Sequence, residues 1–340
     1  GGHELLANPA NPGQAPLPLI PGDLPDPARP YPIRIKDQAG VEVPIVTTSG
    51  SYAYVGRLVA DFDAQGRLVA VDPSSGPVRV AGGTFPDAVP PLPEVTSRVV
   101  EPVRRAMEKM ANTIGTNEVP LEGRSNLVRT RETNLGNLAA DSILWQAREG
   151  SAAAGAPLPA VAISNAGSLR INYVIAPGPV TELQTLEYLP FPNLITVLPG
   201  VSAGEMRELL EWALAKAPES AVQFPLLAGV RVEYEISRSP RQTDKDGKVE
   251  RPGERVREIV LADGTPLVKA GRPVAGAPAI DLATNSYLAS GGDGFPLKPR
   301  RRTQFPVTLQ QAMARYLTQT GERGGLAGKI TAARSPEQAP

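Results

Sequence analysis

A stretch dense in proline and glycine, residues 72–93, divides the sequence into two parts of different character. Patterns typical of short strands precede it, at residues 33–35, 43–48, 52–62 and 68–71. After it, helix and strand patterns alternate. Because such a stretch is typical of a linker, the sequence predicts a first unit at 1–75, a linker at 76–94, a domain at 95–328 and a tail at 329–340.

The second part mixes the two kinds of element. Apolar side chains at helical spacing predict a first helix, which Pro102 should kink or shift: Val95, Val99, Val103, Met107, Met110 and Ile114. Helix starts are indicated at Asn134, Thr181-x-x-Gln184 and Ser202-x-x-Glu205. Strands are predicted at 160–164, 194–198, 229–236, 256–261 and 280–284, with a last helix at 308–320. This mixed order is typical of an α+β domain.

Charge and residue usage exclude several classes of function. With 35 basic and 35 acidic residues the chain lacks the basic excess of a nucleic-acid binder. It has no cysteine and one histidine, His3, so it is poorly equipped for a zinc centre or a serine triad. No apolar run is long enough to span a membrane, and no signal peptide is visible. Since the chain opens Gly-Gly-His, we expect the native N-terminus to lie upstream.

The stretch 285–295 leads from an apolar strand to an exposed aromatic, Tyr287, and then to Gly291-Gly292-Asp293-Gly294. Glycines let a backbone approach a ligand closely, and Asp293 would direct a carboxylate at it. The same residues also fit an ordinary hairpin turn, because Asp-Gly between strand-like segments is a strong hairpin signal. Taken alone, the stretch leaves both interpretations open.

Four segments resemble, in order and spacing, the C-terminal domain of the 5′-nucleotidase and UDP-sugar hydrolase family. They are residues 129–138 (RTRETNLGNL) with Asp141, 165–170 (NAGSLR), 189–193 (LPFPN) and 291–295 (GGDGF). Four ordered motifs are far more specific than any one of them. The resemblance covers residues 95–325 and implies an α+β domain with a mixed sheet.

The resemblance also implies that residues 1–75 are the end of the family's N-terminal metallophosphatase domain, an α/β sandwich. Gly2-His3 falls at a metal-binding Gly-His motif of that domain, which makes His3 a candidate metal ligand. The second ligand position of the motif holds Leu5, which cannot bind a metal. Two divalent ions (Zn, Mn, Mg or Ca) are therefore expected in the intact parent protein and none in this chain. No catalytic residue is expected here, and the missing metallophosphatase domain is the expected partner.

By the same resemblance, Phe191 and Tyr287 hold a nucleoside base between them, and Asp293 accepts hydrogen bonds from the ribose hydroxyls. Stacking on an aromatic ring is worth about 1–3 kcal/mol per base, whichever base it is. The alternative for each ring alone is a core or isolated surface aromatic, and for Asp293 a residue that stabilises a turn. Trp145 and Trp212, on predicted helices, are expected to be packing residues.

Arginines of the first two motifs match family positions that face the phosphate groups of the substrate. Arg129 and Arg170 are the expected pair, because a guanidinium fork fits phosphate oxygens. Arg131 is a further candidate that shares a face with Arg129 only on an extended strand. The basic run at 298–302 is expected to be a solvated face, since the net charge of the chain is zero.

The remaining expected contacts to the nucleoside come from two amides and a glycine. Asn165 and Asn193 can both donate to and accept from a base edge. Gly229 matches a glycine that lets the backbone approach the base. Ser168 and Ala166 replace family glycines and add bulk beside the site.

The resemblance implies the substrate-binding part of an exported hydrolase, periplasmic or at the cell surface, that cleaves nucleoside 5′-monophosphates. One alternative is a related phosphoesterase or a thiosulfohydrolase-like enzyme with another substrate. Of these, only the thiosulfohydrolase-like enzyme would not require a pair of stacking aromatics. Another is a nucleotide-binding surface module without catalysis, which the leucine at position 5 suggests.

Overall fold

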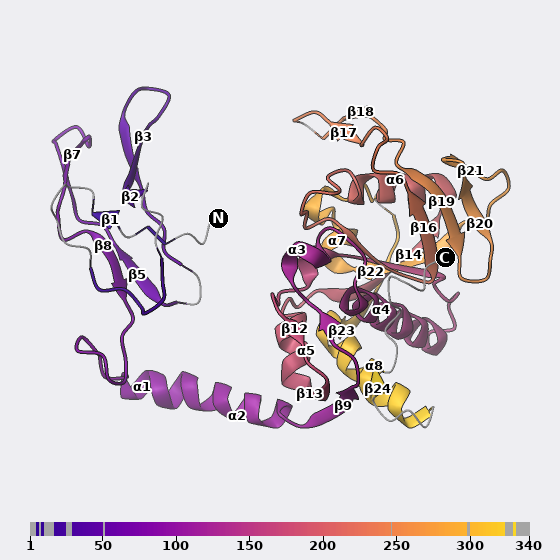
Figure 1. Ribbon diagram of the computed structural model, residues 1–340, viewed down its shortest axis with the longest axis horizontal. Helices are drawn as coiled ribbons and strands as arrows, with labels where there is room; N and C mark the ends of the chain where they lie inside the picture. Colours follow the sequence, from indigo (N-terminus) through magenta and orange to yellow (C-terminus); the bar gives the residue numbers. More distant parts are fainter. Residues whose placement is uncertain are drawn as a thin grey trace. The chain divides into compact units, whose positions relative to one another are not determined.

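The computed structural model describes residues 5–6, 8–9, 17–24, 29–49, 52–245, 247–297, 300–323 and 329–330. The chain divides into two compact units, unit 1 (Gly1–Pro102) and unit 2 (Val103–Pro340), which are described separately (Figure 1). The division falls later than the predicted linker at 76–94. Residues 76–79 belong to unit 1 because they form a strand that pairs with residues 54–57.

Unit 1 consists of short paired strands. The pairs are β1 (Asn8–Pro9) with β2 (Pro30–Tyr31), β3 (Ile33–Lys36) with β4 (Glu42–Ile45), β5 (Tyr54–Arg57) with β8 (Gly76–Arg79), and β6 (Ala60–Phe62) with β7 (Leu68–Val71). The predicted strand at 52–62 is thus two strands with different partners. The β6–β7 turn forms because Asp63 Oδ1 accepts from the backbone N–H groups of Gln65 and Arg67, both at 2.9 Å. Leu5 and Tyr54 form a small buried cluster.

A helical segment spans the division between the units. It comprises α1 (Pro93–Val95), a π-helical turn η1 (Thr96–Val100) and α2 (Glu101–Met110). The wide turn comes just before Pro102, which cannot donate a backbone hydrogen bond, so the predicted irregularity at this proline is confirmed. The first four residues of the predicted apolar stripe, Val95, Val99, Val103 and Met107, are exposed, with Val99 54% accessible. Ile114, the last, lies in the following strand and packs against the core of unit 2.

The central sheet of unit 2 is mixed, as predicted. Its strand order is β15 (Pro225–Ala228), β11 (Val161–Asn165), β22 (Ile280–Asn285), β14 (Leu194–Val201) and β23 (Thr303–Thr308). β11 and β22 run parallel, whereas the other neighbours are antiparallel. Helices α4 (Asn134–Ala153) and α8 (Leu309–Arg323) lie side by side and pack on this sheet (Figure 1).

A second, antiparallel sheet packs against α6 (Ala203–Ala213) and shares the same hydrophobic core. Its order is β16 (Val230–Tyr234), β19 (Val256–Leu261), β20 (Pro266–Lys269) and β21 (Arg272–Pro273). The charged loop that follows β16 carries the hairpin β17 (Gln242–Thr243) and β18 (Val249–Arg251).

Smaller elements complete unit 2. A third sheet has the order β13 (Gly178–Thr181), β9 (Thr113–Asn117) and β24 (Lys329–Ile330), and β10 (Leu121–Glu122) pairs with β12 (Val174–Ile175). The short helices are α3 (Ser125–Val128), η2 (Ala166–Ser168), α5 (Glu182–Tyr188), α7 (Ser286–Ala289) and η3 (Gly292–Gly294). Residues 329–330, predicted as tail, are therefore a strand, and 331–340 lie outside the described residues.

The capping patterns in the sequence predicted the N-caps of two helices correctly. For a third helix they predicted the N-cap one residue too late. Thr181 and Ser202 form the predicted capping boxes of α5 and α6. The cap of α4 is Thr133, whose side chain accepts from Gly136 N, and not Asn134. Asn134 is instead engaged by β10, since its Oδ1 accepts from Glu122 N at 2.8 Å. The α+β class predicted from the order of elements is confirmed.

Candidate functional site

Neighbouring strand ends of the central sheet bring the candidate residues together. Since β11 and β22 are parallel, their last residues, Asn165 and Asn285, lie at the same edge. β14 is antiparallel to β22 and places Ile195 opposite Asn285, so the segment that enters β14 reaches that edge too. The turns after β11 and β22 and the segment 189–193 surround a pocket there.

The loop at 285–295 belongs to this pocket and is not a hairpin. The strand before it, β22, pairs with β11 and β14, whereas the next strand, β23, pairs with β14. The chain leaves β22 through α7, which the Asn285 side chain caps by accepting from Leu288 N at 3.0 Å. It then turns through η3, with Asp293 at φ 51°. This topology excludes the hairpin interpretation of the loop.

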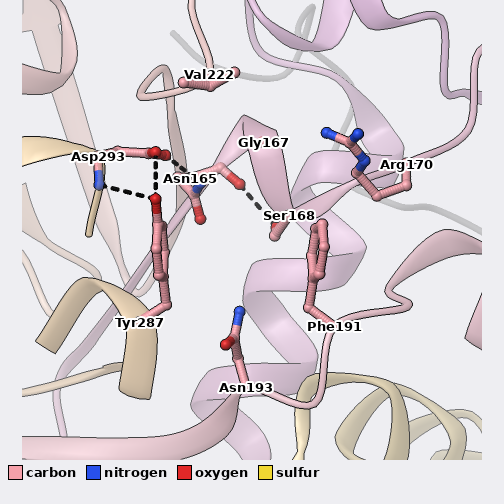
Figure 2. A pocket seen from close by; sticks show the side chains of 9 residues that line it. All are labelled: Asn165, Gly167, Ser168, Arg170, Phe191, Asn193, Val222, Tyr287 and Asp293. Atoms are coloured by element: carbon pink, nitrogen blue, oxygen red, sulfur yellow. Dashed lines mark hydrogen bonds between the residues drawn. The ribbon is translucent and has the colours of Figure 1, made fainter. Parts of the chain in front are cut away.

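The pocket has a volume of about 280 Å³. Its lining is Asn165, Gly167, Ser168, Arg170, Phe191, Asn193, Val222, Tyr287 and Asp293. Figure 2 shows the rings of Tyr287 and Phe191 on opposite sides of the pocket, with Asn193 pointing between them. The two rings are 44% and 40% exposed, so neither is a core residue. An open slot between two aromatic walls suits a flat, aromatic ligand.

Asp293 lies at one end of the slot, held by two side chains. Tyr287 Oη donates to its Oδ1 at 2.8 Å, and Asn165 Nδ2 donates to its Oδ2 at 2.7 Å (Figure 2). The bond to Asp293, and then partial burial, raise the pKa of the Tyr287 phenol above its usual value. Asn165 is buried, and its amide both lines the pocket and donates to the Asp293 carboxylate.

Arg170 is the arginine that lines the pocket. Its guanidinium carbon lies 5.5 Å from the centre of the Phe191 ring, a cation–π distance. Arg129 and Arg131 do not contribute to the lining. They lie in the turn after α3, so they are not held on one extended strand, and Arg129 contacts the site indirectly because its carbonyl accepts from Ala221 N, next to Val222.

Gly229 is not part of the pocket lining either. It links β15 to β16 with φ +76°, and a Cβ added there would stand 2.2 Å from the carbonyl oxygen of Ala160. The close approach that requires glycine at this position is therefore to the protein's own backbone.

Two lining residues were not singled out from the sequence. Gly167 lies within the second motif, 165–170, and that motif was the signal that could have identified it. A Cβ added to Gly167 would stand 2.9 Å from Asn165 Nδ2. Val222 carried no signal, because it precedes β15 in an irregular segment. Ser168 was expected to add bulk, but it is buried and its Oγ donates to Asn165 O at 2.8 Å.

Two tryptophans and the basic run at 298–302 were predicted from the sequence to have no part in the site. Trp145 packs edge-on against Tyr316, with ring centres 5.8 Å apart, which confirms a packing role. Trp212 packs too, but its Nε1 also donates to the carbonyl of Asp293 at 3.0 Å. The basic run is not simply solvated, since Arg300 pairs with Glu205 and Arg302 donates to Ala289 O.

The described residues do not fit a metal centre. Among them, no three His, Cys, Asp or Glu side chains are grouped so that they could hold a metal ion. His3, the candidate metal ligand, lies outside the described residues, and Leu5 is buried against Tyr54. In the part of the chain that the structure describes, no helix has the length and apolar character needed to cross a bilayer.

An α+β fold with an aromatic-walled, carboxylate-ended pocket at its strand ends is typical of a domain that binds small molecules. Comparison with known proteins identifies the family to which this domain belongs. Residues 113–299 match the family described as 5′-nucleotidase, C-terminal domain, and the chain belongs to that family. The resemblance found in the four motifs is thereby confirmed.

Similar proteins are named as nucleotide-cleaving enzymes. The trifunctional nucleotide phosphoesterase YfkN of Bacillus subtilis is 30% identical over 75% of this chain and 16% of its own length. A 5′-nucleotidase of Diplobatis ommata is 24% identical over 82% of this chain and 45% of its own length. A 5′-nucleotidase precursor of Thermus thermophilus aligns with a TM-score of 0.56 and 26% identity, covering 89% of this chain and 54% of that one. The chain thus spans about half or less of each of these proteins.

Proposed function

We propose that unit 2 is the nucleotide-recognition domain of a hydrolase that cleaves nucleoside 5′-monophosphates. The observation that carries this proposal is the slot between Phe191 and Tyr287, with Asp293 at its end (Figure 2). The names of the relatives support a nucleotide as the ligand.

The slot would hold a nucleoside by three kinds of contact. The base stacks between the two rings, which is worth about 1–3 kcal/mol for each good stack. The ribose hydroxyls donate to the Asp293 carboxylate, which accepts but cannot donate when ionised. Arg170 is exposed beside Phe191 and is the lining residue with a positive charge to offer a phosphate group.

The chemistry would be carried out by another part of the intact protein. We assign residues 1–75, which lie within unit 1, to the end of a metallophosphatase domain, whose remaining part would hold two divalent ions (Zn, Mn, Mg or Ca) and would be the partner of unit 2. Among the described residues, no three His, Cys, Asp or Glu side chains are grouped so that they could hold such an ion. In this proposal the chain contributes substrate binding and orientation, and the parent enzyme acts in the periplasm or at the cell surface.

The test is calorimetric titration of the 340-residue chain with adenosine and AMP. Phe191→Ala should weaken adenosine binding by about 5- to 150-fold, the equivalent of one stack. The matched control is Phe62→Ala in unit 1, which removes a ring that is also exposed and should leave binding unchanged.

Two outcomes would contradict the proposal. One is no measurable binding of either ligand by the unaltered chain. The other is equal affinity for Phe191→Ala and the unaltered chain, which would remove the aromatic slot from recognition. A thiosulfohydrolase-like domain would give the first outcome, because its substrate has no base to stack.

A further inference from the structure

Asp293 has a backbone conformation that residues other than glycine rarely adopt. Its φ and ψ are 51° and 20°, in the left-handed region. The neighbouring glycines Gly291 and Gly294 adopt positive φ as well, but they do so without steric cost. A strained residue in a loop persists where its surroundings hold it, and such residues gather at ligand sites.

Four hydrogen bonds hold Asp293, two at its backbone and two at its carboxylate. Its N–H donates to Tyr287 Oη at 3.2 Å, and its carbonyl accepts from Trp212 Nε1 at 3.0 Å. Its two carboxylate oxygens accept from Tyr287 Oη and Asn165 Nδ2. The Tyr287 hydroxyl therefore uses its single proton and one of its two lone pairs on the same residue.

Two aromatic rings also press on the loop on either side of Asp293. A Cβ added to Gly292 would stand 2.5 Å from the Tyr287 ring, and one added to Gly294 would stand 2.6 Å from the Trp212 ring. Both rings therefore contact the backbone of the loop. These contacts help to keep Tyr287 Oη and Trp212 Nε1 within hydrogen-bond distance of Asp293.

Trp212 is itself anchored. The preceding residue, Glu211, is fully buried, and its carboxylate accepts from the backbone N–H groups of Arg255 and Val256 at 3.1 and 3.0 Å. These bonds tie the end of α6 to β19, so the indole reaches Asp293 from a fixed helix.

The carboxylate keeps free acceptor positions despite these bonds. An ionised carboxylate offers about four lone pairs, two on each oxygen. One on Oδ1 and one on Oδ2 are used, by Tyr287 and Asn165. One position per oxygen remains, which matches two adjacent hydroxyl groups such as those of a ribose.

We propose that the Tyr287 hydroxyl and the Trp212 indole are positioning residues that aim Asp293 at a pair of vicinal sugar hydroxyls. The same side chain that stacks on the base through its ring thereby sets the preference for a ribose through its hydroxyl. This inference rests on the proposed function, since it takes the ligand to be a nucleoside.

The experiment compares adenosine with 2′,3′-dideoxyadenosine, which has the same base and neither hydroxyl. The variants are Tyr287→Phe and Trp212→Phe, each of which keeps an aromatic side chain and removes the polar group that holds Asp293. The matched controls are Tyr173→Phe and Trp145→Phe, which alter residues outside the pocket lining. Affinities are measured by calorimetry on the 340-residue chain, and thermal denaturation checks that each variant folds.

Each of the two variants should bind adenosine about fivefold more weakly and dideoxyadenosine within about twofold of the unaltered chain. The controls should change neither affinity. If Trp212→Phe does not fold, Tyr287→Phe alone decides, because that hydroxyl lies at the rim of the pocket.

An equal loss of affinity for adenosine and dideoxyadenosine would overturn the inference, since the hydroxyl would then affect stacking on the base and not recognition of the sugar hydroxyls. Tighter adenosine binding by Tyr287→Phe would also overturn it, because the hydroxyl would then compete with the sugar for Asp293. Unchanged adenosine binding in Tyr287→Phe, with loss in Asp293→Ala, would refute this inference and leave the proposed function standing. If the unaltered chain bound no adenosine, both would be refuted.

Discussion

Gly292→Ala is expected to disable the binding slot without unfolding the domain. An added Cβ would stand 2.5 Å from the Tyr287 ring, whereas carbon atoms in contact prefer about 3.5–4.0 Å. The ring must therefore move by about 1 Å. It is free to do so because it is 44% exposed, and Gly292 has no positive φ that alanine would strain.

The expected loss of affinity follows from what that movement breaks. A displacement of about 1 Å lengthens the 2.8 Å bond from Tyr287 to Asp293 beyond hydrogen-bond range, and one net hydrogen bond is worth about 1 kcal/mol. Misplacing one stacking wall forfeits about another 1 kcal/mol. Together these predict an adenosine affinity reduced roughly 30-fold. The free energy of unfolding should fall by about 1–2 kcal/mol, because the hydrogen bonds between Tyr287 and Asp293 are also present in the unliganded protein.

The assay is calorimetric titration with adenosine, paired with urea denaturation. Gly204→Ala is the matched control, since an added Cβ there meets its nearest neighbours only at 3.9 and 4.0 Å. Undiminished adenosine affinity in Gly292→Ala would refute the argument that the ring over Gly292 forms a wall of the site. A large loss of stability would refute the argument that the ring can move freely.

Three further predictions follow from the site and the fold. The 340-residue chain, supplied with manganese or zinc, should release no phosphate from AMP in a colorimetric assay, because the proposed function assigns the metal-dependent chemistry to another part of the intact protein; turnover that survives purification controls would contradict this. Gly229→Ala should destabilise unit 2 by about 2 kcal/mol or more in urea denaturation, because of the 2.2 Å approach to Ala160 O, and leave the adenosine affinity of the folded protein unchanged. Because the pKa of Tyr287 is raised above 10.0, its hydroxyl bond is present in full below about pH 10 and is lost as the pH rises through the folded-state pKa; the affinity ratio between the unaltered chain and Tyr287→Phe should stay constant between about pH 6 and 9, and a fall within that range would count against the bond.

Features that depend on a few neighbouring residues could be predicted from the sequence. The capping boxes at Thr181 and Ser202 are correct because donor and acceptor lie three residues apart in the chain. The α+β class is correct because it follows from the order of the elements. The cap of α4 was misplaced by one residue because Asn134 is engaged by β10, an interaction that no local pattern encodes.

Burial was harder to predict than periodicity. The apolar spacing from Val95 onward indicated a helix, and the chain is helical there. Spacing describes one element, however, and says nothing about whether another element covers its apolar face. The exposed Val99 and Val103 show that difference.

In the candidate site, too, some features could be predicted from the sequence and others depended on the tertiary structure. The sequence by itself determined which residue types are present: two aromatics, a glycine-flanked carboxylate, two amides and an arginine, in motifs whose family the comparisons confirm. Only the tertiary structure decided that the loop after β22 is not a hairpin, that Arg170 and not Arg129 lines the pocket, and that Trp212 holds Asp293. Asn165 and Asp293 are 128 residues apart, and Trp212 and Asp293 are 81 apart. Contacts at such separations depend on which strands lie side by side, and strand order is set by the packing of the whole domain and not by any local stretch of sequence.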